Sequence, residues 1–207
     1  MTEKEKRDRG ELYDANYDET LLKEMQNTKK ICFELNSLAP DESVARKEIL
    51  ERLLGSAGRH CVILSPFHCD YGYNIHVGEN FFANHGCVML DGARITIGDN
   101  VFIGPLCGFY TATHPLDFER RNRGLEWAKP ITIGNNVWIG GGVHIMAGVT
   151  IGDNTVIGGG SVVTHDIPCN VLAVGNPCNV LRTISNPLIP DSLDGAASCG
   201  AETESRQ

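Results

Sequence analysis

The sequence has no apolar run long enough to cross a bilayer, and its opening segment, MTEKEKRDRG, lacks the apolar core of a signal peptide. We therefore expect a cytoplasmic protein without a membrane partner. Basic residues are scarce as well. There are 18 Lys and Arg against 26 Asp and Glu, and the resulting net charge of −8 argues against nucleic acid as a partner.

The eight cysteines form no recognisable framework, because the sequence contains no CxxC pair and no sign of secretion. We therefore predict neither disulfides nor a zinc site. A length of 207 residues, of which 42% are hydrophobic, is typical of one globular domain with appendages.

What the sequence does contain is a six-residue repeat over 131–163. An aliphatic residue recurs at every sixth position, and a small or β-branched residue follows most of these four positions later. The aliphatic positions are Ile133, Ile139, Ile145, Ile151, Ile157 and Val163. Helices repeat near 3.6 residues and strands near 2, so this period predicts a solenoid of short strands and tight turns, a parallel β-helix. Gly, Asn and Asp supply its corners, where a positive φ is needed.

A weaker copy of the same pattern covers 61–110, with two extra residues inserted around 91–94. Three hexapeptides make one coil, so the two arrays together predict five or six coils. Cys69, Cys87 and Cys107 fall on small inward positions of the first array. We expect these thiols to be buried, reduced and stacked in successive coils.

Three parts follow from these patterns. We expect a helical cap that protects the open edge of the first coil, then the β-helix domain with one protruding loop, and finally a disordered polar tail. The corresponding ranges are 1–60 for the cap, 61–184 for the β-helix, 111–130 for its loop and 185–207 for the tail. Within the cap, apolar periodicity predicts helices over 18–38 and 43–54.

Three stretches resemble one known family: GELYD at 10–14, DYGYNIHVGENFFANHGCVMLD at 70–91 and YTATHPLD at 110–117. Together with the repeats, they make the chain similar to the maltose and galactoside O-acetyltransferases, which are hexapeptide-repeat acyltransferases. This resemblance implies an all-β solenoid, a left-handed parallel β-helix with a short N-terminal helical cap and a protruding loop. It also implies acetyl transfer from acetyl-CoA to a sugar hydroxyl, by a homotrimer whose active sites lie between subunits.

His114 of the ATHP segment matches the catalytic histidine of that family. The chemistry needs such a group, because a sugar hydroxyl attacks a thioester only if its proton is removed as the bond forms. The developing negative charge on the thioester oxygen needs a preorganised donor. The resemblance assigns that oxyanion role to the backbone N–H of Gly141.

The resemblance also suggests residues that bind the two substrates. For the acceptor sugar these are Asp14, Asp70, Asn84, Asp91 and Glu126. For CoA they are Trp138, Gly141, Gly159, Thr164, His165 and Arg182. The sequence leaves open whether Glu126 orients the acceptor, orients His114 or pairs with Lys129. Many relatives have Lys in place of His165 and some have Arg in place of Asn179, so this chain offers CoA phosphates less fixed positive charge.

Three other functions remain to be weighed. A metal enzyme of the gamma-class carbonic anhydrase type is disfavoured, because no two of the seven histidines are four or five positions apart. A non-catalytic scaffold is disfavoured by His114, Asn84 and the residues that match the CoA site. An acetyltransferase for an antibiotic or another non-sugar acceptor is compatible with the sequence. The sequence thus favours an acetyl-CoA-dependent sugar O-acetyltransferase with no metal cofactor.

Overall fold

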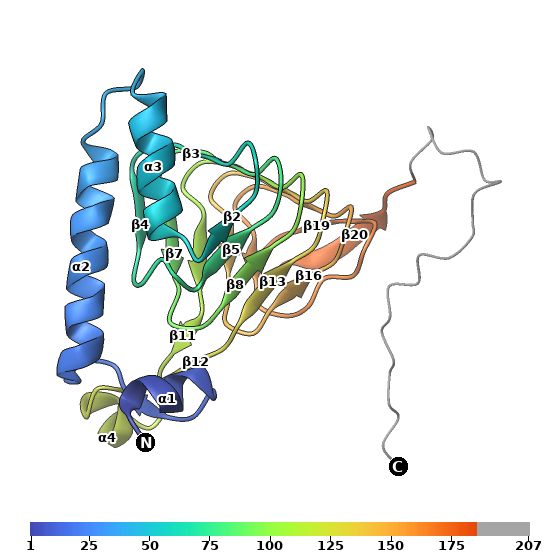
Figure 1. Ribbon diagram of the computed structural model, residues 1–207. Coiled ribbons are helices and arrows are strands. Elements are labelled where there is room, and N and C mark those ends of the chain that lie inside the picture. Colours follow the sequence, from blue (N-terminus) through green and yellow to red (C-terminus); the bar gives the residue numbers. More distant parts are fainter. Residues whose placement is uncertain (186–207) are drawn as a thin grey trace, which may run out of the picture.

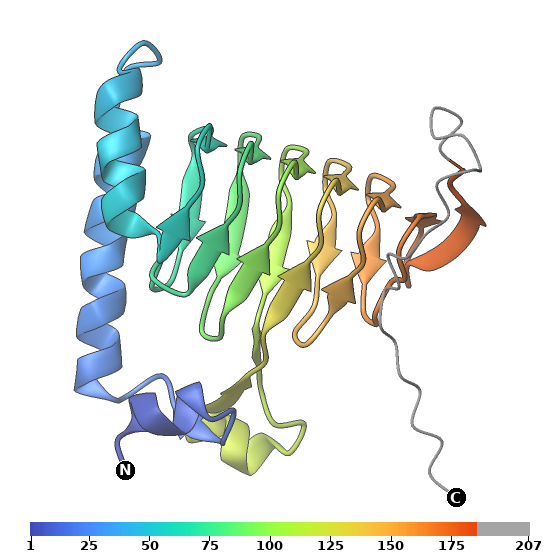
Figure 2. The same cartoon turned by 45° about the vertical axis from the view of Figure 1, so that its right-hand side comes forward.

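The computed structural model describes residues 1–185, so the predicted tail lies almost entirely outside the described part of the chain. The main body is a three-sided prism of short parallel strands, stacked as successive coils (Figure 1, Figure 2). Two helices, α2 (Glu19–Asn36) and α3 (Ser43–Leu53), lie at the end of the prism that carries the first coil. Both helices match their predicted ranges to within two residues, and the prediction of a capped parallel β-helix is confirmed.

Each face of the prism is one sheet whose strands come from successive coils. The first face contains β4 (Phe67–Cys69), β7 (Cys87–Leu90), β10 (Gly108–Tyr110), β15 (His144–Ile145) and β18 (Val162–Val163). The second contains β2 (Ser56–Ala57), β5 (Ile75–Val77), β8 (Ile95–Ile97), β13 (Ile131–Ile133) and β16 (Thr150–Ile151). The third contains β3 (Val62–Ile63), β6 (Phe82–Ala83), β9 (Phe102–Ile103), β14 (Trp138–Ile139), β17 (Val156–Ile157), β19 (Val171–Val174) and the antiparallel β20 (Asn179–Thr183).

The aliphatic residues of the hexapeptide repeat fill the interior of the prism. Successive side chains of a strand point to opposite sides, so alternate residues of a strand point inward, as the buried Ile131 and Ile133 of β13 show. The six aliphatic positions predicted from the repeat are all buried. Each such side chain contributes about 1.5–3 kcal/mol by leaving water, and this burial holds neighbouring coils together.

One corner of the prism, between the first and second faces, is longer than the others. The predicted two-residue insertion after Met89 lies here, and the preceding coil has the same insertion after Cys69. As a result Cys69 pairs with Met89 and Phe67 pairs with Cys87. The prediction that Cys69 stacks on Cys87 is therefore wrong, because the insertion was assigned to one coil instead of two. The predicted burial and free thiol state of Cys69, Cys87 and Cys107 are confirmed.

The large excursion leaves the prism from this same corner in the next coil. It contains β11 (Ala112–Thr113), the short helix α4 (Phe118–Asn122) and β12 (Leu125–Ala128). Its strand β12 pairs on one side with β11 and on the other with β1 (Tyr13–Asp14). The segment expected to be a simple loop is thus a small antiparallel sheet, completed by the N-terminal segment of the same chain (Figure 1).

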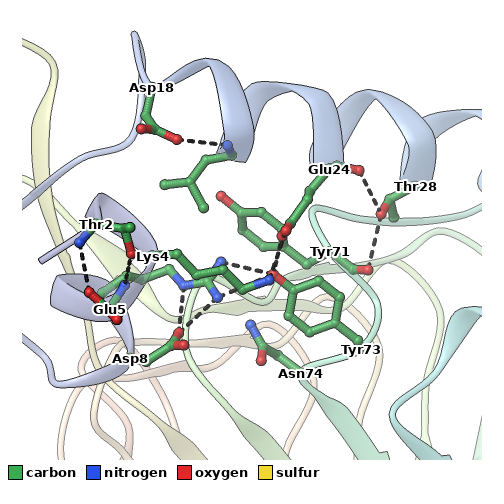
Figure 3. Close-up of polar contacts among 12 residues, drawn as sticks. Thr2, Lys4, Glu5, Asp8, Asp18, Glu24, Thr28, Tyr71, Tyr73 and Asn74 are labelled. Atoms are coloured by element: carbon green, nitrogen blue, oxygen red, sulfur yellow. Dashed lines mark hydrogen bonds and ion pairs between the residues drawn. The ribbon is translucent and has the colours of Figure 1, made fainter.

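A buried arginine anchors the first helix, α1 (Glu3–Asp8), to the prism. The Arg7 side chain is 2% exposed, and its guanidinium donates hydrogen bonds to Asp8 at 2.8 Å and to the Tyr73 hydroxyl at 3.2 Å. It also lies 4.5 Å from the centre of the Tyr71 ring, a cation–π geometry. Tyr73 in turn donates to Glu24 of α2 (Figure 3). These contacts hold α1 against the prism and α2.

Candidate functional site

His114 follows β11 directly and lies beside the strand that returns to the prism. Its Nδ1 atom is 3.3 Å from the carbonyl oxygen of Leu125, and its Nε2 atom is 3.8 Å from Oε2 of Glu126. The His114 side chain is 48% exposed. Pro115 restricts the backbone of His114 to extended conformations. The imidazole is therefore held at the base of the excursion with one edge accessible to a substrate.

Glu126 is the buried neighbour of this histidine. The pairing of β12 with β1 places Glu126 opposite Tyr13, whose hydroxyl donates a hydrogen bond to Oε1 of Glu126. Burial raises the pKa of Glu126, although the bond from Tyr13 and the nearby His114 oppose that shift. Of the alternatives left open by the sequence, the contacts seen for Glu126 correspond to its interaction with His114.

Two aspartates lie at the long corner from which the excursion emerges. Oδ1 of Asp91 accepts hydrogen bonds from the backbone N–H groups of Asp70 and Tyr71, at 2.9 and 2.8 Å. Asp91 is fully buried, and its Oδ2 has no hydrogen-bond partner among the described residues. Burial and the charges of Asp91 and Glu126 raise the pKa of Asp70 to about 6. Asp91 therefore shapes the corner from within, while Asp70 is the more accessible of the two carboxyl groups.

Asp14, the remaining acceptor candidate on this side, lies next to Tyr13 in β1. Its Oδ1 atom accepts hydrogen bonds from the backbone N–H groups of Asn16 and Tyr17, at 3.1 and 2.9 Å. This Asx-turn stabilises the bend that leads into α2. The structure thus gathers Asp14, Asp70, Glu126 and His114 around the excursion and the long corner.

The other candidates lie along different edges of the same prism. Asn84 follows β6, while Gly141 and Gly159 come shortly after β14 and β17, so all three lie on the edge between the third and first faces. Coils approach closely there, because a Cβ on Gly104 would lie 2.5 Å from the nitrogen of Gly141. Within one chain, this edge is distinct from the corner that carries His114.

The remaining positions assigned to CoA are spread over the surface near the last coils. Trp138 projects from the third face and is 58% exposed. Thr164 and His165 follow β18, with Thr164 Oγ1 3.3 Å from His165 Nδ1, and Arg182 is an exposed residue of β20. Exposed cationic and aromatic side chains in this region are compatible with an anionic ligand that has an aromatic base.

Tyr13 is the site residue that sequence reasoning did not identify. It belongs to the GELYD segment, but nothing in that segment points to a partner 113 positions away. The one available signal is a large aromatic residue in an otherwise polar stretch, and this signal does not distinguish packing from a role at the site.

Comparison with known proteins places the chain among acetyltransferases. Residues 6–58 match the family described as maltose acetyltransferase hexapeptide capping motif, and residues 130–165 match the bacterial transferase hexapeptide repeat. A Saccharomyces cerevisiae protein named as a putative acetyltransferase is 57% identical over 85% of this chain and 90% of its own length. A Staphylococcus aureus protein, also named as a putative acetyltransferase, is 53% identical over 94% and 98%. The chain belongs to the maltose and galactoside acetyltransferase family.

Solved structures of this acetyltransferase family superpose closely on the chain. A maltose O-acetyltransferase from Clostridium difficile 630 has a TM-score of 0.88 and 54% identity, over 90% of this chain and 99% of that one. A galactoside acetyltransferase in complex with coenzyme A has a TM-score of 0.86 and 42% identity, over 89% and 92%. The fold is accordingly the left-handed parallel β-helix of hexapeptide-repeat acetyltransferases, as predicted.

Residues 1–185 of this acetyltransferase contain no cluster of three or more His, Cys, Asp or Glu side chains arranged to hold a metal ion. None of the helices in this range has the length and apolar character needed to traverse a membrane.

Proposed function

We propose that the protein transfers the acetyl group of acetyl-CoA to a hydroxyl group of a sugar such as maltose, glucose or a galactoside. The observation that carries this proposal is the placement of His114. Its Nδ1 faces the Leu125 carbonyl, which can only accept a hydrogen bond, so Nδ1 carries the hydrogen and Nε2 keeps a lone pair. A half-exposed imidazole in this tautomer is suited to remove a proton from an acceptor hydroxyl.

In the proposed reaction His114 takes one proton from the acceptor and gives it to the leaving thiolate. Bound acetyl-CoA supplies the acetyl group as a thioester. The hydroxyl proton passes to Nε2 of His114 as the sugar oxygen bonds to the acetyl carbon. When the carbon–sulfur bond breaks, Nε2 returns the proton to the departing sulfur. The backbone N–H of Gly141 is proposed to stabilise the thioester oxygen, since the N–H groups of Gly140 and Gly142 already donate to Ile157 and Pro105.

The acceptor is proposed to lie between His114 and the long corner. Sugars present several hydroxyl donors, and the carboxyl groups of Asp70 and Glu126 are acceptors that match them. The relatives named as maltose and galactoside acetyltransferases support this class of acceptor. Asn84 is proposed to contribute a further hydrogen bond to the sugar, and Asp14 to limit the site from the N-terminal side.

The proposed site is completed by a second copy of the chain. Asn84, Gly141 and Gly159 lie along one edge of the prism, whereas His114, Asp70 and Glu126 lie at another corner. Two prisms packed side by side would bring one subunit's edge to the other's corner, and three would close a ring. We propose a homotrimer with CoA between subunits near Trp138, Thr164, His165 and Arg182. The complexes of relatives with coenzyme A and acetyl-CoA support this choice of ligand.

An acceptor panel tests the proposed function. The purified protein is given acetyl-CoA with maltose, glucose, a galactoside or an antibiotic, and thiol release is followed against acetyl-CoA alone. We expect at least one sugar to accelerate thiol release and to yield an acetylated product by mass spectrometry. If only the antibiotic accelerates thiol release, the acceptor is an antibiotic and the proposed sugar specificity is wrong. If the protein neither releases thiol nor binds CoA, the result would point instead to a non-catalytic scaffold.

A further inference from the structure

The hydroxyl group of Tyr13 is held in a confined position against Glu126. The side chain is completely buried, and its hydroxyl donates to Oε1 of Glu126. Gly92 lies beside that oxygen, and any side chain at this position would crowd the Tyr13 hydroxyl, because its Cβ would lie 3.3 Å away. The backbone of β1 is fixed as well, because it pairs with β12 at Tyr13 and Asp14.

Glu126 links this tyrosine to the histidine. While Oε1 of Glu126 accepts from Tyr13, Oε2 lies 3.8 Å from Nε2 of His114. That nitrogen carries the lone pair, because Nδ1 faces the carbonyl of Leu125. One carboxyl group therefore lies between a permanent hydrogen-bond donor and the atom that accepts the proton in the proposed reaction.

We propose that Tyr13 is a positioning residue for acetyl transfer: its hydroxyl fixes the Glu126 carboxylate beside Nε2 of His114, where it stabilises the imidazolium that forms during the reaction. The proton comes from the acceptor hydroxyl and later leaves Nε2 for the sulfur, so neither Tyr13 nor Glu126 gains or loses one. This role rests on the proposed function, because it concerns the charge that His114 acquires only when it acts as a base.

The charges around Glu126 agree with this arrangement. Burial raises the pKa of Glu126, and the hydrogen bond from Tyr13, the nearby His114 and the more distant Arg7 lower it. Asp70 faces the same region and has its own pKa raised in part by Glu126. Burial and Glu126 raise the pKa of Tyr13 far above its usual value, so Tyr13 remains a donor. Without the Tyr13 hydroxyl, Glu126 would stay neutral over a wider range of pH.

The test compares Tyr13→Phe, Glu126→Gln and the double variant with the wild type, with thiol release measured from about pH 6 to 9. Tyr13→Phe removes a single oxygen and keeps the buried ring. We expect it to lower kcat about tenfold near neutral pH, the effect of one hydrogen bond to a charged group, with little change in KM for acetyl-CoA. The acid limb of its pH profile should move to higher pH, because more Glu126 is neutral there. The double variant should be no slower than Glu126→Gln.

Tyr73→Phe is the matched control. It removes a hydroxyl from a neighbouring tyrosine that contacts Arg7 and Glu24 instead of Glu126. We expect it to lower the melting temperature without moving the acid limb. The positioning role is overturned if Tyr13→Phe keeps the kcat and acid limb of the wild type, if Tyr73→Phe moves the limb equally, or if the double variant loses a further tenfold. A wild type that transfers acetyl to no acceptor overturns the proposed function and this role together, whereas an active wild type matched by Tyr13→Phe overturns this role alone.

Discussion

The side-chain amide of Asn100 donates a 3.2 Å hydrogen bond to the side-chain oxygen of Asn136, although 36 positions separate the two residues. Both have a φ of 56°, the left-handed conformation that asparagine tolerates better than most residues. The contact is one step of a ladder along a single corner of the prism. Its members are Asn80, Asn100, Asn136, Asn154 and Asn170. The excursion that carries His114 thus leaves the prism and returns without shifting the register of the coils.

Asn136→Ala is expected to lower the free energy of unfolding by about 2 kcal/mol. The change removes two side-chain hydrogen bonds, to Asn100 and Asn154. It also places alanine in the left-handed region, where its Cβ is strained and no side-chain hydrogen bond offsets that strain. Asn136→Gly should cost less, because glycine accepts this φ freely. Urea denaturation of the three proteins measures the difference. Equal stability of Asn136→Ala and wild type would show that the ladder does not stabilise the fold.

The repeat predicted the fold because coil stacking depends on local periodicity. Ile139 and Ile157 occupy the same register position in successive coils, and they are 18 residues apart, three hexapeptides, a spacing that is visible in the sequence. The error at Cys69 has a physical cause. Hexapeptide periodicity fixes which residues point inward along a face, but the length of a corner depends on what that corner holds. Here Asp91 accepts hydrogen bonds from the backbone of the coil before it, and no local pattern reveals this.

The site was predictable only where its residues lie in distinctive segments. His114 stands in the ATHP segment, and the resemblance therefore pointed to it. Tyr13 and Arg7 gain their roles from partners distant in sequence, Glu126 for the first and Tyr73 for the second. Polar contacts of this kind have no periodicity, so strand β1 could not be predicted from the sequence pattern, whereas the capping box of Thr2 and Glu5 at the start of α1 was a local signal that was missed.

Asp70→Asn is expected to stabilise the protein above pH 6. Burial, together with the charges of Asp91 and Glu126, raises the pKa of Asp70 to about 6 from an ordinary value of 3.8. The folded state then binds the Asp70 proton more tightly than the unfolded state. The stability contributed by this group is complete below pH 3.8 and is lost as the pH rises through about 6.

The size of this effect follows from the shift of the Asp70 pKa. At neutral pH the ionised carboxylate destabilises the wild type by up to about 3 kcal/mol, and asparagine removes that cost. Denaturant unfolding at a series of pH values should show the two proteins converging near pH 4, while the exposed change Asp41→Asn has little effect. A pH-independent difference between Asp70→Asn and wild type would contradict the assigned pKa.

His165→Lys tests whether this exposed residue lies beside a CoA phosphate. An imidazole loses its positive charge between about pH 6 and 8, whereas a lysine keeps it. We therefore expect KM for acetyl-CoA to rise over this range in the wild type and to stay flat in His165→Lys. Arg182→Ala is the control, because an arginine keeps its charge at every pH and its loss should raise KM uniformly. Identical profiles for wild type and His165→Lys would remove His165 from the phosphate site.

His114→Ala should lower kcat for acetyl transfer by at least ~10²-fold, because the acceptor hydroxyl loses the base that takes its proton. Affinity for acetyl-CoA, measured by calorimetry, and subunit mass, measured by light scattering, should stay close to wild type, since the side chain contacts Leu125 and Glu126 and does not hold the prism together. Wild-type activity should fall at acid pH, where a protonated imidazole can no longer accept. His76→Ala is the matched control, a histidine of β5 that contacts Ser56 on another face and should leave kcat unchanged. A His114→Ala protein that keeps its turnover to within a few-fold, or that loses activity only together with its assembly, would contradict a catalytic role for this residue.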